Sequence, residues 1–282
     1  MTPALEPAAQ TRKLSGPFQG LAVVAFLDLL GFSARLEETW GREDSILPIL
    51  FDLKELIKTN RPSMVVIRDL PEPKVLVRTI SDSIVICCPI QSPDGRFAIS
   101  AITSVLLCAL ILMGEAAKRG FGIRGGVEIG QLYYDEDEII GPAFGRAYSI
   151  ESKIAKKARV LMGPGFLEYL ANNPSDFWVS VGDVLCWTPE GYYGLAGDTT
   201  IVDHLKAVRA SCPTEVLAAK YDEFISQCEN PSSVGRQSRA VWLTGAERIR
   251  HALNPPEIPP IDRGLGEAGR NAKPRKRRRR RR

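Results

Sequence analysis

Apolar runs separated by short polar turns fill the first 160 residues, and their periods distinguish strands from helices. Short runs rich in β-branched residues predict strands, whereas longer segments with apolar residues every three or four positions predict helices. We expect strands at residues 21–28, 74–80, 83–90, 121–134 and 159–162; residues 64–70 are apolar and β-branched as well. We expect helices at residues 45–60, 97–120 and 145–158. This alternation predicts an α+β domain built on a sheet.

The pattern weakens after residue 163. Residues 177–187 and 192–196 have the composition of strands, and residues 202–212, 214–228 and 238–253 have helical spacing. Residues 1–18 are rich in Pro, Ala and Thr, and residues 255–282 in Pro, Gly and charge, which predicts disorder for both. The expected division is therefore a leader (1–18), a core (19–162), an extension packed on that core (163–254) and a tail (255–282).

Charge is unevenly distributed along the 282 residues. The net charge is +4, but the last ten residues, KPRKRRRRRR, carry nine positive charges. Without them the remainder carries a net charge of −5, so the folded part is mildly acidic. The tail supports non-specific attraction to polyanions such as nucleic acid, and a solvated tail without a target explains it equally well.

The six cysteines form no CxxC pair and no cluster with zinc spacing. Cys87, Cys88 and Cys108 lie in apolar runs, where free thiols behave as small hydrophobic residues. The longest apolar stretch, residues 104–114, is too short to span a bilayer, and the N-terminus lacks an apolar signal core. We therefore expect a soluble protein in a reducing cytoplasm, without membrane association.

Two aspartates interrupt the apolar pattern at strand ends. Asp28 ends the first predicted strand within LAVVAFLDLLGF, and Asp82 occupies the turn between two later strands. If these strands are neighbours, the two carboxylates repel each other unless a divalent cation such as Mg²⁺ or Mn²⁺ lies between them. The glycine-containing turn after Asp28 allows backbone N–H groups to approach phosphate oxygens. A purely structural role, capping the next turn, is the alternative for each aspartate.

Three segments in order resemble the signatures of class III nucleotidyl cyclases. FLDLLGFS (26–33) resembles the first, and RTISDSIVI (78–86) resembles the second, with Arg78 at the lysine position and Ser81 at the glycine position. Residues 120–162 resemble the third region, and within the superfamily they look most similar to the short cyclases of the Pycsar anti-phage systems. The resemblance implies a ferredoxin-like βαββαβ core with a C-terminal α/β extension.

The resemblance also implies roles for individual residues. Asp28 and Asp82, with the backbone of Leu29, would be the ligands of two divalent metal ions, Mn²⁺ or Mg²⁺. Arg78 and Glu138 would recognise the base. The turn that binds the triphosphate, mainly through its backbone, would comprise Leu30, Gly31, Phe32 and Ser33.

Two positions depart from the cyclase pattern. Gly145 and Ser149 replace the asparagine and arginine that stabilise the transition state in purine cyclases. Arg146, next to Gly145, and Lys153, one turn after Ser149, are the candidate sources of that positive charge. The resemblance therefore implies a pyrimidine cyclase that makes cyclic UMP, or else cyclic CMP, as a signal in anti-phage defence. It further implies a homodimer with shared active sites. A conventional adenylyl or guanylyl cyclase and a nucleotide-binding module without turnover are the alternatives.

Overall fold

The computed structural model describes residues 17–59, 73–90, 95–135, 137–173, 178–196, 202–212, 214–229, 234 and 237–254. The strands are β1 (Phe18–Leu30), β2 (Leu76–Ile80), β3 (Ser83–Pro89), β4 (Gly122–Tyr134), β5 (Ile139–Ile140), β6 (Val160–Met162), β7 (Leu185–Trp187) and β8 (Tyr193–Leu195). The helices are α1 (Phe32–Thr39), α2 (Leu47–Thr59), α3 (Gly95–Lys118), α4 (Pro142–Lys153), α5 (Pro164–Asn172), α6 (Trp178–Asp183), α7 (Val202–Ala210), α8 (Glu215–Glu229) and α9 (Arg239–Leu253).

These strands form one mixed sheet with the order β2-β3-β1-β4-β6-β8-β7, and β5 pairs with β4. The neighbours from β2 to β4 are antiparallel, whereas β6 runs parallel to β4. The order β4-β1-β3-β2 is that of a split βαββαβ unit, in which each helical connection returns the chain to the same sheet. The α+β class predicted from the sequence pattern and the βαββαβ core implied by the resemblance are therefore both confirmed.

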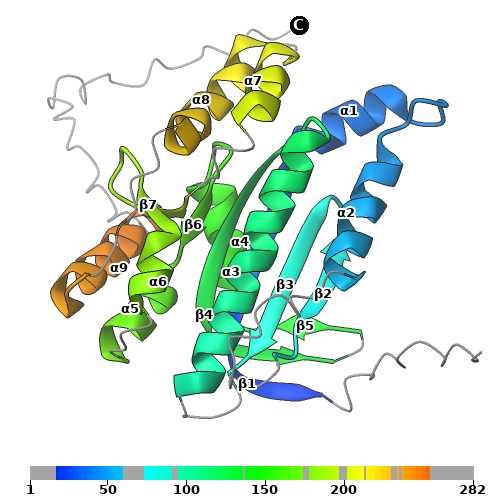
Figure 1. Cartoon of the computed structure of the whole chain (residues 1–282). Coiled ribbons are helices and arrows are strands. Elements are labelled where there is room, and N and C mark those ends of the chain that lie inside the picture. The colour runs from blue at the N-terminus through cyan, green and yellow to red at the C-terminus, as the bar shows by residue number, and fades with distance from the viewer. Residues whose placement is uncertain are drawn as a thin grey trace, which may run out of the picture.

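Helix α3 covers one face of the sheet and forms the centre of the main core (Figure 1). The alternating residues Val23, Ala25 and Leu27 of β1 point toward this core, as the period of a strand requires. Helix α3 is long and apolar enough to cross a membrane, but most of it is buried against the sheet. Burial in the core therefore explains its composition.

Helix α4 covers part of the opposite face. The other alternating residues of β1, Ala22, Val24 and Phe26, belong to the apolar cluster on this face. Close approach of α4 to β4 depends on Gly126, because a Cβ atom there would lie 2.5 Å from the carbonyl oxygen of Ala147. The first polar residue in this series of β1 is Asp28, which places its carboxylate on the side of α4.

Several predicted elements differ from those observed. Helices α1 and α5 form in segments where the sequence pattern predicts no helix. Helix α4 begins at Pro142 rather than residue 145, because proline is favoured in the first turn of a helix. The strand predicted at 177–187 is wrong in its first half, which forms α6. The run 64–70, the tail 255–282 and nearly all of the leader lie outside the described residues.

Candidate active site

Asp28 and Asp82 lie next to each other at one end of the β1–β3 ladder. Asp28 is paired in register with Ser83, the first residue of β3, and Asp82 immediately precedes it in the β2–β3 turn. Ser81 of this turn has a left-handed backbone (φ 55°), a conformation that favours the glycine found here in the resembling cyclases. Two residues 54 positions apart in the sequence are thus brought together by strand pairing.

The Asp28 carboxylate is buried and hydrogen-bonded. Arg124 of β4, its partner in the register, donates from Nε to Oδ2 over 2.8 Å, and the Ser83 hydroxyl lies 3.4 Å from Oδ1. Burial raises the pKa of Asp28, the Arg124 guanidinium opposes that shift, and the neighbouring Asp82 charge adds to it. The two aspartates therefore interact electrostatically across the turn.

A third carboxylate joins this group from α4. Glu151 is buried, and its Oε1 lies 2.7 Å from the same Arg124 Nε. Burial raises the pKa of Glu151 to about 7; the Arg124 charge opposes this shift, and the charges of Asp28 and Asp82 increase it. One guanidinium thus contacts two carboxylates, Asp28 and Glu151, and the Asp82 charge acts on both of them.

Sequence reasoning did not assign roles to Arg124 and Glu151. The signal for Arg124 was its charge inside an otherwise apolar strand. The signal for Glu151 was its position four residues after Ala147, on the same face of the helix. Neither signal identifies a partner without the register of β1 and β4.

The turn after β1 leads directly into α1. Gly31 has a left-handed backbone (φ 79°) and occupies the N-cap of α1, where no side chain of the described residues caps the helix. The Ser33 hydroxyl donates a hydrogen bond to Oδ2 of Asp82. Phe32 is buried against Phe121, so this residue can meet a ligand only through its backbone. The uncapped first turn therefore presents N–H groups beside the aspartates.

The donor set fits a divalent cation. Asp28 and Asp82 provide hard oxygen ligands, and the carbonyl of Leu29 follows directly in the chain. If all three carboxylates are ionised, Arg124 alone leaves an excess of two negative charges, which one divalent ion would balance. Within the described ranges, however, no group of three or more His, Cys, Asp or Glu side chains is arranged to hold a metal by itself. Water and substrate oxygens would have to complete the coordination.

Glu138, one of the two residues expected to recognise the base, lies in the β4–β5 turn, and the other, Arg78, reaches this turn from β2. Arg78 of β2 is paired with Val85 of β3, which is paired in turn with Phe26 of β1. Phe26 and Asp28 are two residues apart on β1, so Arg78 and Asp28 lie on the same face of the sheet. Its Nη2 donates to the Asp135 carbonyl over 2.9 Å, and its buried Nε has no hydrogen-bond partner among the described residues. The backbone of exposed Glu138 is hydrogen-bonded to Asp135.

Arg146 lies on the opposite flank of α4 from Glu151. Its Nε lies 3.2 Å from Oε2 of the fully buried Glu128, which also accepts hydrogen bonds from the backbone of Ile129 and Phe166. Gly145 on the outer face of α4 is exposed. Within one chain, therefore, Arg146 is not brought to Asp28 and Asp82.

No protein-family model and no curated protein sequence matches the chain. Its structure is similar to a class III adenylyl cyclase-like ATP-binding protein from Pseudomonas aeruginosa, with 13% identity, a TM-score of 0.40, and coverage of 55% of this chain and 35% of that chain. It is also similar to a bacterial light-regulated adenylyl cyclase, with 17% identity, a TM-score of 0.33, and coverage of 54% and 46%. The chain thus matches less than half the length of either protein. Sequence identities and TM-scores this low support no conclusion about the site.

Proposed function

We propose that the protein is a nucleotidyl cyclase. The reaction would join the ribose 3′-oxygen of a nucleoside triphosphate to its α-phosphate and release diphosphate. The observation that carries this proposal is the adjacency of Asp28 and Asp82, linked by the Ser33 hydrogen bond to the uncapped first turn of α1. Carboxylates for cations and N–H groups for phosphates at one place are the requirements of phosphoryl transfer.

Different groups of the proposed site would bind the cations, orient Asp28 and bind the phosphates. Two divalent ions held by Asp28, Asp82 and the Leu29 carbonyl would lower the pKa of the 3′-hydroxyl and neutralise the phosphates. Arg124 orients the Asp28 carboxylate and opposes the rise in its pKa that burial causes. The backbone N–H groups from Gly31 to Ser33 bind phosphate oxygens, aided by the positive end of the α1 dipole.

The proposed substrate is a pyrimidine nucleotide, UTP in preference to CTP. Gly145 and Ser149 lack the groups that purine cyclases use at these positions, and Arg78 with Glu138 would provide the polar contacts to the base. The enzyme would act as a cytoplasmic homodimer in anti-phage defence, with the exposed outer face of α4 contributing to the partner's site. These finer features rest on the sequence resemblance.

A nucleotide-binding module without turnover is the second candidate. One observation favours it: Arg124 occupies an oxygen of Asp28 and thereby competes with a cation for this ligand. The two candidates make opposite predictions for product formation.

The test is incubation of the purified protein with each of the four nucleoside triphosphates and Mn²⁺, with products identified by mass spectrometry. We expect a cyclic pyrimidine nucleotide that is absent with Asp28→Asn and with Asp82→Asn but present with Asp52→Asn, a matched change on the exposed face of α2. A cyclic purine product would overturn the substrate assignment. No product from any triphosphate would favour the binding module.

A further inference from the structure

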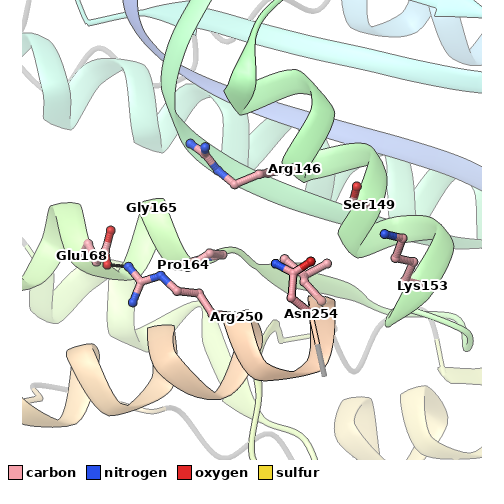
Figure 2. Close-up of a pocket in the computed structure, with 9 residues that line it drawn as sticks. Arg146, Ser149, Lys153, Pro164, Gly165, Glu168, Arg250 and Asn254 are labelled. Carbon is pink, nitrogen blue, oxygen red and sulfur yellow. Dashed lines mark ion pairs between the residues drawn. The ribbon is translucent and has the colours of Figure 1, made fainter. Parts of the chain in front are cut away.

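A cavity separate from the aspartate site lies between α4, α5 and α9. Its volume is about 390 Å³, within the range of small-molecule pockets. Figure 2 shows α4 on one side, α9 on the other and the start of α5 between them. It is lined by Arg146, Ser149, Lys153, Pro164, Gly165, Glu168, Arg250, Leu253 and Asn254.

This cavity and the aspartate site lie on different flanks of α4. Glu151 and Tyr148 face Arg124 and Phe26, respectively, on the side of β1. Arg146 and Lys153 line the cavity on the side of α9. A ligand in the cavity would therefore not contact Asp28 of the same chain.

Three cationic side chains from two distant parts of the sequence meet around this space. Arg146 is paired through Nε with Glu128, and Arg250 is paired with Glu168, which leaves further N–H donors on each guanidinium. Lys153 has no ion pair within the described ranges. Burial raises the pKa of Glu128 to about 7, so its negative charge compensates Arg146 only partly near neutral pH. The cavity therefore carries net positive charge.

The remaining walls determine what kind of anion fits. Ser149 and Asn254 add neutral hydrogen-bonding groups, while Leu253 and Pro164 add an apolar surface. Guanidinium groups bind phosphate oxygens through paired N–H donors, and Lys153 adds a point charge. A bare inorganic ion would use the charges but not the apolar wall.

We propose that this cavity binds a small organic phosphate, with Lys153 and Arg250 as its main contacts to the phosphate. The ligand bridges α4, which belongs to the predicted core, and α9, which belongs to the predicted extension. Because the cavity lies apart from Asp28 and Asp82, this inference does not depend on the proposed cyclase activity.

The test is isothermal titration calorimetry with ribose 5-phosphate in buffer containing EDTA, which removes the metal that binding at the aspartate site would require. We expect saturable binding that Lys153→Gln and Arg250→Gln each weaken at least 10-fold. Lys156→Gln is the matched control, since Lys156 is exposed three residues after Lys153, beyond the end of α4, and does not line the cavity. The double variant Asp28→Asn/Asp82→Asn should bind like the wild type, which separates this result from the fate of the cyclase proposal.

Three results would overturn the inference. They are the absence of saturable binding, binding unchanged in both Lys153→Gln and Arg250→Gln, and equal weakening by Lys156→Gln. Circular dichroism melting checks that each variant is folded. If Arg250→Gln unfolds because Glu168 loses its partner, Ser149→Trp replaces it: it keeps the charges but fills the cavity, and retained binding would contradict the proposal.

Discussion

The Ser33 hydroxyl donates a hydrogen bond to the Asp82 carboxylate, across 49 positions of sequence. This contact fixes the β2–β3 turn against the start of α1, so one metal-ligand candidate is positioned by the turn proposed to bind phosphate. Asp82 itself is placed beside Asp28 by the β1–β3 register. The two halves of the proposed site are therefore joined by one side-chain hydrogen bond and one strand pairing.

Replacing Ser33 with alanine should weaken catalysis without abolishing it. The hydroxyl orients Asp82, and loss of a hydrogen bond to a charged group costs about 1.5–3 kcal/mol, or roughly 10- to 100-fold in kcat/KM. Steady-state kinetics of Ser33→Ala against Ser152→Ala, whose hydroxyl donates to the Tyr148 carbonyl of its own helix, measures this effect. Equal activity of the two variants would show that Ser33 does not position Asp82.

Arg124→Gln should destabilise the metal-free protein by about 2–4 kcal/mol, because Asp28 and Glu151 would then be buried without a cation. Arg119 provides the control: its side chain is as exposed as that of Arg124, at 30%, but its partner Glu115 is much less buried than Asp28 or Glu151. Arg119→Gln should cost less than about 1 kcal/mol.

Urea unfolding with and without Mn²⁺ measures both variants. We expect Mn²⁺ to restore part of the stability lost in Arg124→Gln, because a cation bound to the carboxylates replaces the missing charge. Equal losses in the two variants would contradict the description of Arg124 as the counter-charge of a buried carboxylate group.

Much of the fold could be predicted because burial leaves a period in the sequence. Helix α3 and strands β1, β3 and β4 follow the predicted ranges closely, since their apolar residues face a core on one or both sides. Helix α1 was missed because its sequence, FSARLEET, buries only Phe32 and so carries no apolar stripe. Helix α6 spans six residues, too few for its period to differ clearly from that of a strand.

The site was predictable only in part, because some of its residues interrupt an apolar pattern and others meet only through tertiary contacts. Asp28 and Asp82 interrupt apolar runs and are therefore visible in the sequence. Glu151 lies on a helix face whose other members are small or apolar, and its relation to Arg124 depends on how α4 crosses β4. The cavity beside Arg146 could not be foreseen, because it needs the position of α9.

Gly126 should be intolerant of a side chain. A Cβ atom would lie 2.5 Å from the Ala147 carbonyl oxygen and 2.7 Å from Ile150 Cβ, so α4 would have to move away from β4. Gly126→Ala should cost about 1–3 kcal/mol in the free energy of unfolding. Gly145→Ala, in the same helix but with nothing within 4 Å, should stabilise by about 1 kcal/mol. Thermal unfolding of the two variants should therefore shift in opposite directions; a shared direction would contradict the packing of α4.

Stability should fall as the pH rises through the weakly acidic range. The pKa of Glu128 is raised from 4.5 to about 7 by burial, so between these values the folded state holds a proton that the unfolded state has lost. Glu128→Gln removes this contribution, which is on the order of 3 kcal/mol between pH 4.5 and 7.5. Chemical unfolding across this range should give a flatter profile for Glu128→Gln, whereas Glu247→Gln, on the exposed face of α9, should follow the wild type. A steeper fall in Glu128→Gln would show that Glu128 is charged in the folded protein.

The joint binding of divalent cations by Asp28 and Asp82 is the central claim, and Mn²⁺ titration followed by electron paramagnetic resonance tests it most directly. In the presence of a non-cyclisable UTP analogue, the wild type and Asp52→Asn should bind Mn²⁺ saturably. Asp28→Asn and Asp82→Asn should each lower the affinity by at least 10-fold. Equal Mn²⁺ affinity in all four proteins would contradict the account, because the two carboxylates would then be structural groups rather than metal ligands.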